Sequence, residues 1–156
     1  MGVPAWKKFE NDVQKHFLER METEPMIYHR FYDTASAQGF LPVQPGDHLV
    51  VYRGVPILIE TKFSEKHESL RSCFSSHVPD EQMGSHRLWT RAGAITLLAF
   101  RGTNGHELWD GAYLADCRTH GRRLDKSERL KSDCLFEDLF KEVTITCRYG
   151  RKLHVF

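Results

Sequence analysis

The residues most able to do chemistry in this chain are Asp47, Glu60 and Lys62. Two carboxylates held within a few ångströms repel each other, and a divalent cation is the usual way for both to stay ionised. Oxygen ligands from Asp and Glu favour Mg²⁺ or Mn²⁺. A cation there can polarise a phosphodiester oxygen and lower the pKa of a bound water, while Lys62 orients that water or stabilises charge on the phosphate. The three residue types therefore fit phosphodiester hydrolysis.

An exposed salt bridge is the alternative interpretation, because Glu and Lys are common and Glu-x-Lys often arises by chance. The position of the motif favours chemistry. Charged residues are rare directly after a strand as apolar as residues 55–59, and an aspartate precedes the motif across a predicted hairpin. We therefore interpret Asp47, Glu60 and Lys62 as a candidate catalytic set.

A β-hairpin must position these side chains. Residues 48–53 and 57–63 form two apolar, β-branched runs separated by a short turn. The second run begins apolar on both faces, which is typical of a central strand covered on both sides. Residues two apart in a strand share a face, so Glu60 and Lys62 project to the same side while Thr61 points away.

The turn of this hairpin decides whether Asp47 joins the pair. A two-residue turn at Arg53–Gly54 places Asp47 opposite Glu60, and one at Gly54–Val55 places it opposite Lys62. Both registers put Asp47 on the face of the pair, whereas a three-residue turn without a bulge moves it to the other face. The inference about Asp47 thus depends on the hairpin register.

The remaining elements follow from hydrophobic periodicity and from Gly and Pro breakers. We expect helices at 5–21, 79–93, 124–131 and 135–143. Strands are expected at 26–32, 94–100 and 108–115, with a terminal strand pair at 143–149 and 152–156. Loops or connections are expected at 33–46 and 64–77. This order predicts an α/β fold with a mixed β-sheet flanked by α-helices, in a single domain spanning residues 1–156.

Composition supports a folded protein and limits its partners. Of 156 residues, 40% are hydrophobic and 28% are charged, which is typical of a globular domain. No apolar run approaches the roughly 20 residues of a membrane-spanning helix, and no apolar core follows the first lysines. We therefore expect a cytoplasmic protein, and the small size of the chain suggests a bacterial or phage-infected cell. The net charge of +1 means that nucleic acid binding would need a local basic surface.

The cysteines predict neither disulfides nor a zinc site. The four of them are widely spaced, so we expect reduced thiols. The nearest approach to a zinc site is His67, Cys73 and His77, which lacks both the usual spacing and a fourth ligand.

The stretch Pro45-Gly46-Asp47, followed by twelve residues and then Glu60-Thr61-Lys62, resembles the PD-(D/E)XK nuclease superfamily. The hairpin and a later Gln82-x-x-x-His86 resemble RecU-type Holliday junction resolvases, over roughly residues 5–100. The resemblance implies a restriction-endonuclease-like sheet flanked by helices and a homodimer with two active sites. It also implies Mg²⁺- or Mn²⁺-dependent nicking of branched DNA, in particular four-way junctions, during DNA recombination and repair.

The same resemblance implies roles for individual residues. Asp47 and Glu60 would be metal ligands with the Thr61 carbonyl, and Lys62 would be the catalytic lysine. Two further catalytic positions would be Glu10, as the helical carboxylate that completes the site, and Gln82, as a support for Lys62 or the water. Each of these two has a plain alternative, because Glu10 also fits a solvated helix position and Gln82 an ordinary helix start.

The sequence departs from the family pattern in its motif and in the segment related to substrate choice. Residue 46 is Gly where the superfamily pattern has Pro, and Phe31–Pro45, in the place of the RecU stalk, is short and carries only the charge of Asp33. Another nuclease of the superfamily, restriction-like or exonucleolytic, and a non-catalytic DNA-binding module of the same fold are therefore the alternatives.

Two groups of basic residues could meet DNA phosphates. Those near the candidate site are Lys7, Lys8, Arg30, Arg53, Lys66, Arg71, Arg87 and Arg91. A second group, which we interpret as the solvated face of a helix, comprises Arg122, Arg123, Lys126, Arg129 and Lys131.

Overall fold

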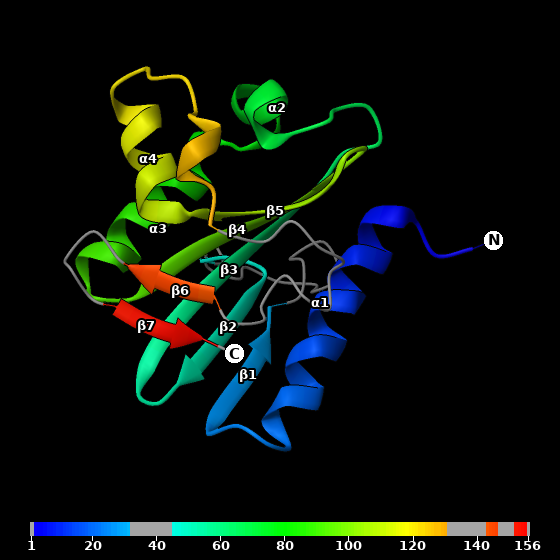
Figure 1. The fold of residues 1–156 in the computed structure, drawn as a ribbon, viewed down its shortest axis with the longest axis vertical. Coiled ribbons are helices and arrows are strands. Elements are labelled where there is room, and N and C mark those ends of the chain that lie inside the picture. The colour runs from blue at the N-terminus through cyan, green and yellow to red at the C-terminus, as the bar shows by residue number, and fades with distance from the viewer. Residues whose placement is uncertain (1, 32–44, 131–142, 147–151, 156) are drawn as a thin grey trace, which may run out of the picture.

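A five-stranded mixed sheet forms the centre of the computed structural model, which describes residues 2–31, 45–130, 143–146 and 152–155. The strand order is β1-β2-β3-β4-β5, with β3 and β4 parallel and the other neighbours antiparallel. The strands are β1 (Met26–Arg30), β2 (His48–Tyr52), β3 (Val55–Phe63), β4 (Ile95–Gly102) and β5 (Gly105–Asp110) (Figure 1).

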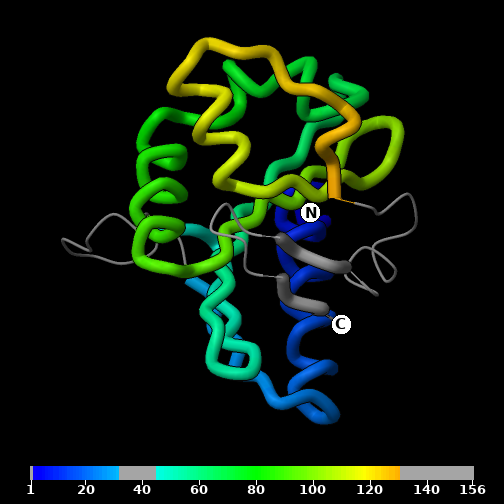
Figure 2. Tube along the Cα trace, turned by 60° about the vertical axis from the view of Figure 1, so that its left-hand side comes forward, coloured from blue at the N-terminus to red at the C-terminus, as the bar shows by residue number. Residues whose placement is uncertain are grey.

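Helices cover both faces of this sheet. They are α1 (Ala5–Met21), α2 (Leu70–His77), α3 (Asp80–Arg91) and α4 (Gly111–Thr119), followed by the short 3₁₀ helix η2 (Lys126–Glu128). Figure 2 shows α1, in blue, and α3, in green, on opposite sides of the strands. The predicted α/β fold with a mixed, helix-flanked sheet is confirmed.

Two hydrophobic clusters divide the strands by residue parity, as a pleated sheet requires. Ile59 and Leu97 belong to the cluster that packs against α1, whereas Leu98 belongs to the cluster shared with α2, α3 and α4. In the parallel ladder Glu60 pairs with Leu98. Glu60 and Lys62 therefore lie on the face covered by α2, α3 and α4, and Thr61 lies on the face of α1.

The hairpin has the first of the two predicted two-residue turns. Tyr52 pairs with Val55, so the turn is Arg53–Gly54, and both turn residues have positive φ (49° and 79°). Two consecutive residues with positive φ are typical of the type I′ turn, whose twist matches that of the flanking strands. The ladder continues to His48↔Ile59.

Several predicted elements agree closely with the structure. Helix α1 has the predicted bounds, α3 begins directly after Pro79, and Gly93 follows its end with a positive φ of 96°. The terminal strands β6 (Val143–Thr146) and β7 (Lys152–Val155) form an antiparallel pair as predicted. The predicted helix 135–143 lies outside the described residues except Val143, which begins β6, and the predicted loop 33–46 is described only at its end.

Two other predictions were wrong in their element type. The connection 64–77 contains α2, whose buried face consists of Leu70, Cys73 and Phe74. In place of the predicted helix 124–131, the described residues 124–130 contain η2, because the carboxylate of Asp125 accepts from the backbone of Ser127 and stabilises a tight turn instead.

The predicted strand 108–115 is also wrong in its second half. β5 ends at Asp110, whose Oδ1 accepts from the backbone N–H of Ala112 at 2.9 Å and caps α4. Gly111 is required there, since a Cβ would lie 2.1 Å from Nδ1 of His86.

None of the helices within the described residues combines the length and the apolar composition needed to cross a bilayer.

Candidate active site

The candidate site lies where β3 continues beyond His48, the first residue of the antiparallel strand β2. The β2–β3 ladder stops at Ile59, so the backbone of Thr61 has no partner strand on this side. The carboxylate of Asp47 takes that place, because its Oδ2 accepts from the backbone N–H of Thr61 at 2.7 Å and from the Thr61 hydroxyl at 2.6 Å. Asp47 also donates its own N–H to the carbonyl of Ile59 at 3.1 Å. These bonds fix Asp47 beside the Glu60-Thr61-Lys62 segment.

Glu60 is nearly inaccessible to solvent, with 3% of its surface exposed. Its Oε1 accepts from Nε2 of Gln82 at 2.6 Å and lies 2.9 Å from Nζ of Lys62. Gln82 comes from the first turn of α3, so this helix reaches the site through Glu60 rather than through Lys62. One carboxylate oxygen thus joins three predicted site residues.

The electrostatics of Glu60 reflect crowding by like charges. Burial, followed by the negative charge of Asp47 and to a smaller extent that of Glu10, raises the pKa of Glu60 to about 7. The ammonium of Lys62 opposes these effects without cancelling them. Such a carboxylate is poorly neutralised by the protein alone, which is the condition under which a cation binds well.

Glu10 contributes to this field from α1. Its Oε2 lies 2.7 Å from Nη2 of Arg30, and this guanidinium also donates to Asn11 at 2.9 Å and to Gln14 at 2.8 Å. Burial raises the pKa of Glu10, the charge of Asp47 raises it further, and the charge of Lys62 lowers it. Glu10 is therefore ion-paired with Arg30 and interacts electrostatically with Asp47 and Lys62, rather than being a solvated helix residue.

Two further residues of α3, Ser85 and His86, lie near the candidate site although we did not predict them as site residues. The hydroxyl of Ser85 donates to the carbonyl of Pro45 at 2.8 Å, which ties α3 to the segment just before Asp47. His86 is fully buried, and burial followed by the charge of Lys62 lowers its pKa to about 4. A hydrogen-bonding serine in a helix carries no sequence signal that would have revealed the first contact.

The basic residues gather differently from the prediction. A cleft with a volume of about 510 Å³ is lined by Lys66 and Arg71 from the first group and by Arg123 and Lys126 from the second. The second group is thus not a helix face, since η2 is only three residues long. Arg30 is held by Glu10, and Arg87 donates to the hydroxyl of Thr119 at 2.7 Å. The cleft, rather than one face of the whole first group, is where basic residues of both groups meet.

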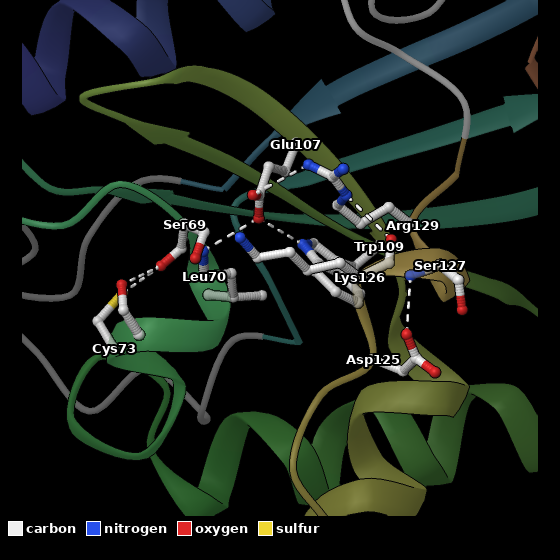
Figure 3. Close-up of polar contacts among 10 residues, drawn as sticks. Ser69, Leu70, Cys73, Glu107, Trp109, Asp125, Lys126, Ser127 and Arg129 are labelled. Atoms are coloured by element: carbon white, nitrogen blue, oxygen red, sulfur yellow. Dashed lines mark hydrogen bonds and ion pairs between the residues drawn. The ribbon is translucent and has the colours of Figure 1, made fainter.

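A second buried glutamate, Glu107, makes polar contacts with residues near this cleft (Figure 3). Its Oε2 accepts from the backbone N–H of Leu70 at 3.0 Å and from Nε1 of Trp109 at 2.9 Å, and its Oε1 lies 3.4 Å from Nη1 of Arg129. Glu107 therefore links β5 to the start of α2 and to the residue that follows η2. Sequence reasoning missed it, because its partners come from distant parts of the chain.

Comparison with known proteins adds little to this geometry. No family model matches the chain, and no curated protein matches it. Among solved structures the chain is similar to Hjc of Archaeoglobus fulgidus, described as a Holliday junction resolvase from an archaeal hyperthermophile. The TM-score is 0.42 with 11% sequence identity, over 63% of this chain and 74% of that chain. A similarity of this size carries no inference about function.

Proposed function

We propose that this protein is a metal-dependent, structure-selective endodeoxyribonuclease that nicks branched DNA, as a Holliday junction resolvase does. The observation that carries the proposal is the contact of Asp47 with the Glu60-Thr61-Lys62 segment at the open end of β3. The sequence pattern predicted these residues as a set, and the hairpin register brings them together.

Mg²⁺ or Mn²⁺ fits the donors at this site. Both side chains that would hold it, Asp47 and Glu60, are carboxylates, and hard oxygen donors suit these ions. Among the described residues, the contacts of Asp47 use Oδ2 and those of Glu60 use Oε1. One oxygen of each carboxylate is therefore left for a cation, and we propose the Thr61 carbonyl as a further ligand. When bound, the ion would polarise the phosphodiester and activate a water.

The protein side chains supply orientation and charge. Lys62 is held by Glu60, so its ammonium stays beside the carboxylates, where it stabilises charge that develops on a phosphate. Gln82 donates to Glu60 and fixes the direction of that carboxylate. Glu10 adds negative charge close to Asp47 and Lys62, and we propose that it completes the cation site.

The basic cleft supports DNA as the substrate. Since the net charge is only +1, phosphate binding has to come from a local concentration of cations. The cleft provides one, with four basic side chains and a single acidic one, Glu68, in its lining.

We further propose a homodimer, because two active sites are needed to nick two strands of a junction.

Cleavage of matched substrates tests the proposal. The protein is incubated with a four-way junction and with a linear duplex of the same sequence, in Mg²⁺ or in EDTA. We expect paired, symmetric nicks in the junction that require Mg²⁺, and loss of these nicks in Glu60→Gln. Glu65→Gln, which changes an exposed glutamate five residues further along the chain, is the matched control and should cut normally.

Each other outcome has a defined meaning. Equal cutting of the linear duplex would replace junction specificity with a more general nuclease activity. Undiminished cutting by Glu60→Gln would show that the site is wrong. Junction binding without cutting under any metal condition would identify a non-catalytic DNA-binding module.

A further inference from the structure

Three potential metal ligands meet outside the candidate active site, although their spacing had argued against a zinc site. His67 lies in the segment between β3 and α2, and Cys73 and His77 lie on α2. One ligand atom from each residue lies within 4.8 Å of the others. Cys73 and His77 can approach the same ion because they are four residues apart on α2, and residues four apart in an α-helix occupy the same face.

The donor types point to a borderline-soft transition metal. Two imidazole nitrogens and one thiolate are ligands that Zn²⁺ prefers, and they do not suit Mg²⁺. Zinc bonds of about 2.0–2.3 Å place tetrahedral ligand atoms about 3.5 Å apart. Starting from separations of at most 4.8 Å, side-chain movements of about 1 Å are enough to form such a site.

The histidine rings are oriented by neighbouring serines. The hydroxyl of Ser64 lies 2.8 Å from Nδ1 of His67, and the hydroxyl of Ser76 lies 3.0 Å from Nδ1 of His77. A hydrogen bond at Nδ1 leaves Nε2 for an ion, which is the usual arrangement of metal-binding histidines. Burial, followed by the charges of His67 and Lys62, lowers the pKa of His77, and the neutral imidazole is the form that binds a metal.

Cys73 supplies the buried ligand of the group. Only 1% of its surface is exposed, and its Sγ–H donates to the carbonyl of Ser69 at 3.6 Å. Burial, followed by the charge of Glu107, raises the pKa of the thiol to about 11. The thiol is therefore protonated without a metal, and a bound ion displaces that proton as the Sγ–metal bond forms.

We propose that His67, Cys73 and His77 bind one Zn²⁺-class ion, with water in the fourth position. Within the described part of the chain, no fourth His, Cys, Asp or Glu joins the group. The ion would connect the segment after β3 to α2. It would thereby stabilise the chain that leads away from Lys62, five residues before His67. This proposal is independent of the nuclease activity.

Titration with Co²⁺ tests this site directly, because cobalt bound to a thiolate gives a charge-transfer band in the near ultraviolet and tetrahedral cobalt gives strong visible bands. The full chain is reduced, stripped with a chelator and titrated in excess Mg²⁺, which occupies carboxylate sites. We expect both signals to saturate at one equivalent of Co²⁺ and to disappear when Zn²⁺ is added. Saturating Zn²⁺ should also raise Tm by about 5 °C.

Variants assign the signal to these residues. Cys73→Ser should lose the charge-transfer band, and His77→Ala, at a less buried position, should weaken cobalt binding at least tenfold while the circular dichroism spectrum stays native. Cys117→Ser, which changes the other buried cysteine among the described residues, is the matched control and should keep the band. Glu60→Gln should also keep it, which separates this site from the nuclease proposal.

Two results would overturn the assignment. The first is the absence of a charge-transfer band in the folded wild-type protein at stoichiometric Co²⁺. The second is a band that persists in Cys73→Ser, because the thiolate would then come from another cysteine.

Discussion

Glu60 and Glu107 are both buried glutamates, yet their surroundings differ in kind. Glu107 is 6% exposed and accepts from a backbone N–H and an indole, with an arginine beside its other oxygen. Glu60 is 3% exposed, has one amide and one ammonium as partners, and lies near two further carboxylates. Burial alone therefore does not distinguish the two glutamates. The difference lies in whether the protein supplies enough donors or leaves repulsion that a cation can relieve.

The largest effect is expected at Asp47. Asp47→Asn keeps the shape of the side chain and one acceptor for Thr61 but removes a carboxylate, so Mg²⁺-dependent cleavage should fall by about 10³-fold. Initial rates of junction cleavage measure this. Asp12→Asn, on α1 and 41% exposed, is the matched control and should leave the rate unchanged. A loss of less than about threefold in Asp47→Asn would remove Asp47 from the catalytic set.

The raised pKa of Glu60 predicts a pH dependence of stability. Because folding raises this pKa from 4.5 to about 7, the folded protein holds a proton that the unfolded chain releases between these values. Stability is thus highest below pH 4.5 for this group and declines by about 3 kcal/mol as the pH rises to 7.

Comparing wild type with Glu60→Gln isolates the contribution of Glu60 together with its coupling to Asp47, Glu10 and Lys62, since groups remote from the site titrate equally in both proteins. Urea unfolding in EDTA at several pH values gives the free energies. As the pH rises from 4.5 to 7, the free energy of unfolding of the variant should increase relative to that of the wild type. Mg²⁺ should reduce this difference, because it stabilises the wild type with Glu60 ionised. A difference independent of pH would mean that Glu60 is ionised normally.

At Glu107 the expected effect is on stability rather than on catalysis. Glu107→Gln weakens the hydrogen bonds to Leu70 and Trp109 and removes the charge that faces Arg129, which should lower the free energy of unfolding by about 2 kcal/mol. Denaturant unfolding measures the loss, and cleavage below the unfolding transition should stay near the wild-type rate. Full loss of cleavage in the folded variant would contradict the comparison.

The smallest effect is expected in the basic cleft. The double variant Arg123→Gln and Lys126→Gln should weaken junction binding about tenfold at low salt and reduce the salt slope of the affinity by about 1.8. Fluorescence anisotropy across a salt series measures both. Lys15→Gln, an exposed lysine on α1, provides the control. If the double variant matched this control, the cleft would not contact DNA phosphates.

Local pattern was enough to predict much of the fold and the core of the site. The periodicity of residues 5–21 predicted α1, and the observed Arg53–Gly54 turn was one of the two predicted registers that place Asp47 on the face of Glu60 and Lys62. Strand parity alone put Glu60 and Lys62 on one face. These features depend on neighbours in the chain, which is why the sequence reveals them.

Features made by distant residues could not be predicted in this way. The donors to Glu107 come from residues 70, 109 and 129, and the cleft joins residues 66–72 to residues 123–126. Helix α2 was not predicted because most of its residues are polar and only three are buried. Without this helix, the approach of His67 to Cys73 and His77 could not be predicted either. Only tertiary packing brings these groups together.

Calorimetric titration with Mg²⁺ tests the central claim most directly, because it asks whether the crowded carboxylates around Glu60 bind a hard cation. Wild type and Glu107→Gln should bind Mg²⁺ with equal affinity, and Glu60→Gln should bind at least about tenfold more weakly. Equal binding by wild type and Glu60→Gln would contradict the account.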